Sequence, residues 1–452
     1  MQNINTSYFT EWLNKFINFQ RNLNKDIQNL DKMNKFAAFF NNPHLAYKNI
    51  HIAGSKGKGS TSIMISSILK EAGLLTGLYT SPHVMDFRER ISCAGTFFSD
   101  ETYSKTYKKI IEGFETIIKN DPLSDPGWFE IVTMTAFLLF QSEQMEIAVI
   151  ETGLGGRLDM TNILVPEATV LTPIELEHCK YLGNTIEKIA FEKAGIIKKG
   201  KPVFCSKQKP EALKVFKEKA KETNSDFFYL PEILENPAEF KTSKEGLKIN
   251  IAFKKDNPVG KLFKRAVKTK LKLIDEIQAE NAALAACTVK YLFPNIDESI
   301  LEKGLAKAWL PARFEILLKN PLIVIDGAHT KNSLELCINT YRKLNSKKGT
   351  LIFACADDKD TKEIAPLFKN RFKKIILTIP GTFKKSNIDY TYNDFKNVFK
   401  GCPEIPEKNE DYKGIIRKTL EECIKTNSPL LITGSFYLAA EAKTIYGGLN
   451  CN

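Results

Sequence analysis

Residues 50–61 have the sequence IHIAGSKGKGST, a short β-branched run followed by a loop of glycines, serine and lysines. Residues 50–53 predict a buried strand, and the apolar spacing after the loop predicts a helix from about residue 60 to residue 72. Glycine permits backbone angles that bring successive N–H groups together, and the start of a helix adds a favourable dipole for anions. We therefore expect a phosphate-binding loop between this strand and this helix.

The loop departs from the common GxxxxGK[ST] spacing, because Gly59 separates Lys58 from Ser60. We expect Lys58 to reach the terminal phosphates of a nucleotide, and Ser60 or Thr61 to lie near a metal ion. A flexible basic loop is the alternative, but the strand–loop–helix context favours nucleotide binding. The residues expected to contact the nucleotide here are Gly54, Ser55, Lys56, Gly57, Lys58, Gly59 and Ser60. Alone, this motif indicates an NTPase or a kinase and nothing finer.

Short β-branched runs alternate with helical patterns along the chain, which is typical of an α/β fold with a mostly parallel sheet. Residues 147–152 and 168–172 predict further strands, whereas the charged stretch from 210 to about 272 predicts peripheral strands and loops. After Pro311 four more strands are expected, at 322–325, 351–354, 374–377 and 430–433. We predict a P-loop-type, mostly parallel sheet domain with helices on both faces at 1–309, followed by a smaller Rossmann-like α/β domain at 310–452.

Composition excludes several classes of protein. The 452 residues are 43% hydrophobic and 26% charged, a globular balance. No apolar run approaches the roughly 20 residues of a membrane span, and the N-terminus has no signal-peptide pattern. The nine cysteines form no CxxC pair, which argues against a zinc ribbon or a disulfide framework. The formal charge of +12 is dispersed rather than gathered, so we expect no nucleic-acid partner. These features predict a cytoplasmic protein.

Several strings follow the phosphate loop in a fixed order. They are TSPH at 80–83, FRERI at 87–91, ETGLGGRLDMTN at 151–162, EH at 177–178, LGNT at 182–185 and EKAGII at 192–197. Together they resemble the folylpolyglutamate synthase/dihydrofolate synthase family, a branch of the Mur-type amide ligases, from about residue 30 to residue 440. The GLGGR-x-D-x-TN and SPH…ERI strings are the most specific of them.

The resemblance implies an ATP- and Mg²⁺-dependent ligase. ATP would phosphorylate a folate-type carboxylate, and the amine of L-glutamate would then displace phosphate to form an amide. The protein would shield charge on the transferred phosphoryl group and hold two anionic reactants in place. The implied partners are small molecules: ATP, L-glutamate, and a folate or dihydropteroate. We expect a monomer with no membrane partner.

By resemblance, Ser81, Glu151 and His178 would hold magnesium, which prefers few protein ligands and completes its shell with water and phosphate. Each residue has a structural alternative: a turn residue, a strand-end charge and a helix cap. All three lie at or just past the ends of candidate strands, however, and parallel sheets bind ligands at the carboxyl ends of their strands.

Lys193, in the EKAG string, matches a family lysine that carbon dioxide converts to a carbamate. That reaction needs a neutral amine, and hence a lysine whose pKa is lowered by burial or by nearby positive charge. An ordinary solvated helix lysine is the alternative. The resemblance implies that Lys193 is carbamylated and catalytic.

Further ATP contacts are implied by three later strings. Asn281, three residues after Gln278, would contact adenine, although an N-cap role is nearly as compatible with its spacing. Arg313, in PARFE, would reach the phosphates when the domains close about a hinge near 309–313. Asp326 would contact the nucleotide, and His329 would lie near the reacting centre as a catalytic residue. The chain departs from the family strings at four positions: Asp275 and Ile277 before the glutamine, Ala312 for glycine, and Thr330 for asparagine.

The pterin would lie between the SPH…ERI loop, the helix that starts near Trp128, and residues 158–160. The implied folate contacts are Arg90, Phe129, Leu158, Asp159 and Met160. Apolar residues there suit a flat heterocycle but equally suit a core. A segment at 18–21, which contributes in bifunctional members, matches no family string, so the choice between dihydropteroate and tetrahydrofolates stays open.

Three rival functions are weaker. A cell-wall Mur ligase would need a UDP-binding N-terminal domain and would not carry the SPH…FRERI loop. A non-catalytic nucleotide-binding protein would be expected to lack Lys58, Glu151, His178 or Lys193, and all four are present. A nucleic-acid-binding ATPase explains the charge but none of the later strings. Of the five histidines, His44 and His51 fall outside the strings and are expected to be packing residues.

Overall fold

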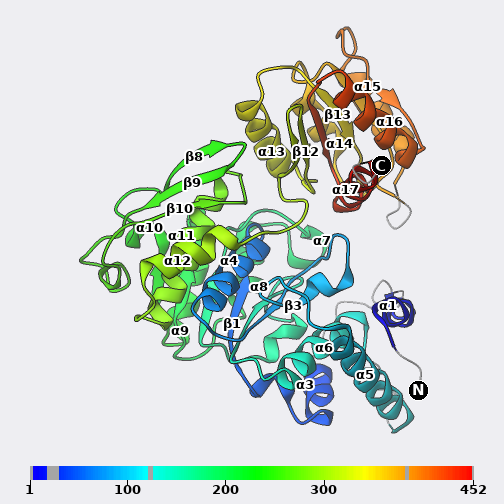
Figure 1. The fold of residues 1–452 in the computed structure, drawn as a ribbon. Coiled ribbons are helices and arrows are strands. Elements are labelled where there is room, and N and C mark those ends of the chain that lie inside the picture. Colours follow the sequence, from blue (N-terminus) through cyan, green and yellow to red (C-terminus); the bar gives the residue numbers. More distant parts are fainter. Residues whose placement is uncertain (1–3, 18–29, 121–125, 382–385, 450–452) are drawn as a thin grey trace. The chain divides into compact units, whose positions relative to one another are not determined.

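The protein is described here by a computed structural model that covers residues 4–17, 30–120, 126–381 and 386–449 (Figure 1). Its described residues form two compact units. The N-terminal unit comprises residues from 1–239, 249–270 and 277–309, and the C-terminal unit comprises residues from 240–248, 271–276 and 310–452. The domain division expected after residue 309 stays a prediction, and the segment 18–21 lies outside the described residues.

A seven-stranded sheet forms the centre of the N-terminal unit, in the order β3-β2-β4-β1-β5-β6-β7. Every neighbouring pair is parallel except β2 and β3. The strands are β1 (Lys48–Ala53), β2 (Thr76–Tyr79), β3 (Ile91–Cys93), β4 (Ile147–Glu151), β5 (Ala168–Leu171), β6 (Val203–Cys205) and β7 (Phe227–Tyr229). Strands β1, β4 and β5 are buried almost throughout, as expected for a parallel sheet covered on both faces.

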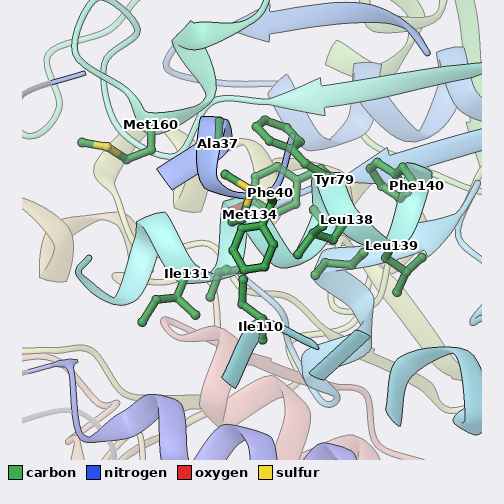
Figure 2. Close-up of a cluster of buried hydrophobic side chains, with 14 of the residues drawn as sticks. Ala37, Phe40, Tyr79, Ile110, Ile131, Met134, Leu138, Leu139, Phe140 and Met160 are labelled. Atoms are coloured by element: carbon green, nitrogen blue, oxygen red, sulfur yellow. The ribbon is translucent and has the colours of Figure 1, made fainter. Parts of the chain in front are cut away.

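Helices cover this sheet. They are α1 (Thr6–Asn14), α3 (Leu30–Phe39), α4 (Lys58–Glu71), α5 (Asp100–Asn120), α6 (Trp128–Ser142), α7 (Cys179–Leu182), α8 (Ile186–Ala194), α9 (Pro210–Glu222), α10 (Leu230–Ile233), α11 (Ile277–Leu292) and α12 (Glu298–Lys307). Helices α4, α11 and α12 pack together, while α6 packs with α5. Figure 2 shows the core around α6, where Met134 and Leu138 lie among side chains from α3, α5 and β2. No helix in the described ranges is long and apolar enough to cross a membrane.

The charged stretch from 210 to 272 differs in part from the expectation. It contains the strands β8 (Glu239–Ser243), β9 (Gly246–Ile251) and β10 (Val267–Leu271), which form a three-stranded sheet, but it opens with the 13-residue helix α9. Ala212, Phe216 and Ala220 are buried on α9 at four-residue spacing. The expectation of strands and loops alone was therefore wrong for α9, because three buried residues suffice to anchor a helix whose other positions are mostly charged.

The C-terminal unit holds a six-stranded sheet in the order β11-β12-β16-β13-β14-β15, parallel except for β11 and β12. Its strands are β11 (Glu315–Lys319), β12 (Leu322–Ile325), β13 (Thr350–Phe353), β14 (Lys374–Leu377), β15 (Glu407–Lys408) and β16 (Leu430–Thr433). Its helices are α13 (Lys331–Leu344), α14 (Thr361–Ile364), α15 (Ile388–Val398), α16 (Tyr412–Lys425) and α17 (Phe436–Leu449). The predicted α/β class, with two mostly parallel sheets flanked by helices, is confirmed.

Candidate functional site

The loop between β1 and α4 lies tightly against its surroundings. A Cβ added to Gly54 would lie 1.8 Å from Thr172 Oγ1, so no other residue fits without a shift. Gly57 has φ +83° as the N-cap of α4, and a Cβ there would lie 2.6 Å from Asn281 Oδ1. Both positions therefore require glycine, one for close approach and one also for its backbone angle. The backbone N–H groups of Ser55 and Lys56 both donate to Pro173 O, at 2.9 and 3.2 Å.

Lys58 opens helix α4, and its side chain folds back over the loop. Its Nζ donates to Gly54 O at 2.9 Å. Gly59 and Ser60 follow in the first turn of a 14-residue helix, and Thr61 Oγ1 is buried with no hydrogen-bond partner among the described residues. A lysine, a helix start and an unsatisfied hydroxyl at one place are features that a bound phosphate group would use.

The three expected magnesium ligands follow three parallel strands of the same sheet. Ser81 comes after β2, Glu151 is the last residue of β4, and His178 follows β5. The backbone N–H of Ser81 donates to Glu151 Oε2 at 3.1 Å, which brings two of the three together. Glu151 is buried, whereas His178 is exposed, with φ +50° at the start of α7. No group of three or more His, Cys, Asp or Glu side chains suited to a metal gathers among the described residues.

Lys193 is buried beneath the phosphate loop rather than solvated. It is only 1% exposed; its Nζ donates to Gly54 O at 2.7 Å and lies 3.4 Å from Glu177 Oε1. Burial, together with the nearby Lys58 ammonium, lowers the pKa of Lys193 to about 8, against the opposing influence of Glu177. The carbonyl of Gly54 thus accepts from two catalytic candidates, Lys58 and Lys193.

Glu177 is a site residue to which sequence analysis gave no role. Burial alone would raise its pKa, but the surrounding cations Lys58, Lys193 and Lys56 outweigh burial and lower it. A carboxylate among these lysines partly neutralises the basic loop. Its adjacency to His178 in the EH string was the signal available.

Arg90 lies in the SPH…ERI loop, which Glu89 organises by accepting from the backbone N–H groups of residues 84–86. Arg90 is 8% exposed; its Nε donates to His83 Nδ1 at 2.7 Å, and its guanidinium lies 4.9 Å above the Trp128 ring. Burial, and secondarily the Arg90 charge, lowers the pKa of His83 to about 4, so this imidazole is neutral and can accept. Arg90 therefore links this loop to Trp128, the first residue of α6.

The other expected folate contacts lie around the loop after β4. A Cβ on Gly153 would lie 2.4 Å from Phe129 Cζ, so the Phe129 ring packs directly on this loop. Leu158 is half-buried, while Met160 is buried in the core of Figure 2. Asp159 is also buried, with Oδ2 accepting from Gly153 N and Leu154 N and Oδ1 from Thr161. Contacts of these four residues with folate stay predictions.

Asn281 lies in α11 with its side chain buried. Its Nδ2 donates to Gln278 Oε1 at 3.0 Å, and its Oδ1 faces Gly57 of the phosphate loop. Asn281 is therefore an interior residue of the helix rather than its N-cap, since α11 begins at Ile277. Its expected contact with adenine stays a prediction.

In the C-terminal unit, Asp326 fixes the backbone on which Arg313 lies. Its Oδ2 accepts from Phe314 N and its Oδ1 from Ala328 N, both at 2.7 Å. The Arg313 guanidinium lies 4.5 Å above the Phe436 ring. His329 Nδ1 lies 2.8 Å from Gly327 O, so that nitrogen carries the proton it donates. The expected nucleotide contacts of Arg313 and Asp326, and the catalytic role of His329, stay predictions.

Two departures from the family strings now have structural accounts. Thr330 is the N-cap of α13, where its hydroxyl and backbone N–H both meet Ser333 Oγ. Asp275 lies near Asp326 and Arg313; burial, with the Asp326 charge, raises the pKa of Asp275. Burial likewise raises the pKa of Asp326. An acidic pair of the half-buried Asp275 and the buried Asp326 was not foreseen, although Asp275 stood out as a departure.

Ala312 provides a direct test of linker strain. It has φ +52° and is fully buried, a backbone conformation that costs an alanine roughly 1 kcal/mol relative to glycine. We expect Ala312→Gly to raise the free energy of unfolding of the C-terminal unit by about 1 kcal/mol. Chemical denaturation of both proteins measures this, with Ala365→Gly as the matched control expected to destabilise, because Ala365 is a buried alanine of the C-terminal unit with φ −53°. A destabilised Ala312→Gly would contradict the strain.

Comparisons with known proteins agree with this geometry. Residues 52–289 match the Mur ligase middle domain, and residues 312–436 match the Mur ligase glutamate ligase domain. The fold and site thus define a Mur-type ligase. A dihydrofolate synthase/folylpolyglutamate synthase of Bacillus subtilis is 32% identical over 430 residues, covering 92% of this chain and 94% of that protein. The chain belongs to the folylpolyglutamate synthase/dihydrofolate synthase family.

Solved structures give the same result. Folylpolyglutamate synthase from Thermotoga maritima is 28% identical, with a TM-score of 0.81, and the match covers 99% of this chain and 98% of that one. A folylpolyglutamate synthase solved in complex with AMPPCP and folate is 27% identical, with a TM-score of 0.78, covering 98% of this chain and 100% of that one.

Proposed function

We propose that this chain is an ATP-dependent ligase that joins L-glutamate to a folate-type carboxylate. The observation that carries the proposal is the convergence at the carboxyl edge of one parallel sheet. The phosphate loop follows β1, the Ser81–Glu151 pair follows β2 and β4, and Lys58 and Lys193 both bind the Gly54 carbonyl. Family membership and the AMPPCP and folate complex of a relative support the same function.

In the proposed reaction, an oxygen of the substrate carboxylate attacks the γ-phosphorus of ATP, and ADP leaves. The glutamate amine then attacks the carbonyl carbon of the acyl phosphate, and inorganic phosphate leaves as the amide forms. The backbone N–H groups in the first turn of α4 and the Lys58 ammonium would hold the phosphates and balance the charge that spreads over the transferred group. Exclusion of water protects the acyl phosphate from hydrolysis.

Magnesium would be held by Ser81, Glu151 and His178, where it would neutralise phosphate charge as a Lewis acid. The Ser81 hydroxyl and the buried Glu151 carboxylate fit magnesium, because they are hard oxygens at the ends of neighbouring strands and leave positions for water and phosphate, whereas His178 would add a nitrogen ligand. Lys193 would be carbamylated; its lowered pKa of about 8 supplies the neutral amine that this modification needs. Cytoplasmic location and a monomeric state remain predictions from the sequence.

The function is tested by mass analysis of products. Purified protein is incubated with ATP, Mg²⁺ and L-glutamate, and with either dihydropteroate or tetrahydrofolate. A product heavier by one glutamyl residue in either arm is expected, and the arms together show whether the enzyme adds the first glutamate, extends the chain, or does both. The Bacillus subtilis relative is named for both activities, so both arms are needed. ATP hydrolysis without either product would contradict the proposal.

Glu151→Gln tests the magnesium assignment. The substitution keeps the shape but removes the charge, so we expect lower activity and about a tenfold higher half-saturating Mg²⁺ concentration. Magnesium titrations of product formation measure both effects. Glu115→Gln, an exposed carboxylate on α5, is the matched control. An unchanged titration would show that Glu151 only supports the Ser81 backbone.

A further inference from the structure

A buried histidine on the central strand β1 begins a chain of hydrogen bonds. The His51 side chain is fully buried, and its Nε2 lies 2.8 Å from Thr161 Oγ1. The Thr161 hydroxyl donates its only proton to Asp159 Oδ1 over 2.5 Å. Because that hydroxyl has no second proton, it accepts from His51, and the ring carries its proton on Nε2. Burial, assisted by Lys198, lowers the pKa of His51 to about 3, so the ring is neutral.

The other end of this chain is the loop between β4 and the short 3₁₀ helix Met160–Ile163. Asp159 Oδ2 accepts from Gly153 N and Leu154 N, each at 2.9 Å, and Oδ1 also accepts from Thr161 N at 3.0 Å. All of these groups lie in the N-terminal unit. Four bonds to one buried carboxylate therefore close the loop at 153–160, and they leave little of its accepting capacity for a ligand.

This loop carries the expected folate contacts Leu158 and Met160, and Phe129 packs on Gly153 within it. At its start it follows directly from Glu151, the expected magnesium ligand. A change in loop shape would therefore move folate-side groups, while the phosphate loop is held separately by Pro173, Thr172 and Asn281.

We propose that His51 is a positioning residue for the folate-side loop at 153–160, acting through Thr161 and Asp159 without touching a substrate. This role rests on the proposed function and replaces the packing role expected for His51 from the sequence. Packing requires only the volume of the ring. Positioning requires its Nε2 donor, since loss of that donor leaves the Thr161 hydroxyl free to rotate away from Asp159.

The variants that separate these roles are His51→Phe, which keeps the volume without the donor, and Thr161→Val, which keeps the shape without the hydroxyl. Thr161→Ser retains the hydroxyl. His44→Phe is the matched control, because His44 is also buried and neutral, with a ring 5.7 Å from Phe137. Calorimetry measures the Kd for AMPPCP and for whichever of dihydropteroate and tetrahydrofolate binds the wild type.

We expect His51→Phe and Thr161→Val each to weaken folate-side binding about tenfold, with AMPPCP binding changed less than about twofold. Thr161→Ser and His44→Phe should bind as the wild type does. The double variant His51→Phe/Thr161→Val should lose about as much folate-side affinity as either single variant, because both substitutions interrupt the same chain of hydrogen bonds. If His51→Phe does not fold, the Thr161 pair carries the same comparison.

If Thr161→Val binds the folate substrate with the wild-type Kd, the inference is overturned. It is also overturned if the variants lose affinity for folate and AMPPCP to the same extent while their melting temperature falls. If the loss of folate-side affinity in the double variant equals the product of the losses in the two single variants, the inference is also overturned, because that result indicates two independent packing defects. A wild type that forms no glutamyl product fails the proposed function instead, so the two failures are distinguishable.

Discussion

Lys58→Ala is expected to lower the rate of glutamate addition by about 10³-fold while the fold is retained. Lys58 is the first residue of α4, and its ammonium group lies over the loop, where it donates to Gly54 O at 2.9 Å. Charge on the transferred phosphoryl group grows during the reaction, and a fixed cation in a water-excluded site stabilises that charge far more than solvent does. Truncation removes the cation without opening the core, since Lys58 is only half-buried.

Product formation and the Kd for AMPPCP measure this change, and the melting temperature reports the fold. Lys70→Ala is the matched control, because Lys70 lies near the other end of the same helix and is exposed. We expect wild-type rates from it. Turnover near normal in Lys58→Ala would remove the lysine from the mechanism.

Lys193→Ala is expected to abolish glutamate addition, and small carboxylic acids are expected to restore part of it by filling the vacated anionic position. The physical reason is the environment of the amine: buried beneath the phosphate loop, with a pKa of about 8, it is about one-tenth neutral at pH 7. Because only the neutral amine reacts with carbon dioxide, the modified fraction at fixed dissolved carbon dioxide should rise as the pH increases through about 8.

Lys188→Ala, on the exposed side of the same helix α8, is the control expected to remain active. Intact mass after rapid trapping, or density beyond Nζ in a crystal, detects the carbamate directly. An unmodified Lys193 in a fully active enzyme at saturating bicarbonate would contradict the modification and leave the lysine as a cation holding Gly54 and Glu177.

The parts of the fold that could be predicted are those that local sequence determines. The strands at 322–325, 374–377 and 430–433 are short runs dominated by leucine, isoleucine and valine, and the structure has them with those bounds. The strand, glycine-containing loop and helix at 48–71 were foreseen because their signals lie close together in the sequence, and phosphate binding by the loop stays a prediction. Helix α9 was missed because its buried face is only three residues wide.

The contacts within the site could not be predicted from the sequence, because they join distant segments. Lys193 and Gly54 are 139 positions apart, and His51 and Thr161 are 110 apart. The burial of Lys193 depends on the loop at 54–59 that covers it, so the helix sequence around Lys193 does not reveal it. The ligand contacts expected of Asp159 and Asp326 stay predictions; the structure adds that both carboxylates accept from backbone N–H groups, a role that motif matching did not reveal.

Phosphorylation of the substrate carboxylate before the amide forms is tested by following the carboxylate oxygen. The accepting carboxylate of the folate-type substrate is labelled with heavy oxygen, and the enzyme is supplied with ATP, Mg²⁺ and L-glutamate. The phosphate released is then analysed by mass. We expect one labelled oxygen in each phosphate formed per amide bond, because the carboxylate oxygen that attacks the γ-phosphorus leaves with it. Unlabelled phosphate, released while the amide product forms at the same rate, would contradict the acyl-phosphate route and the roles assigned to this site.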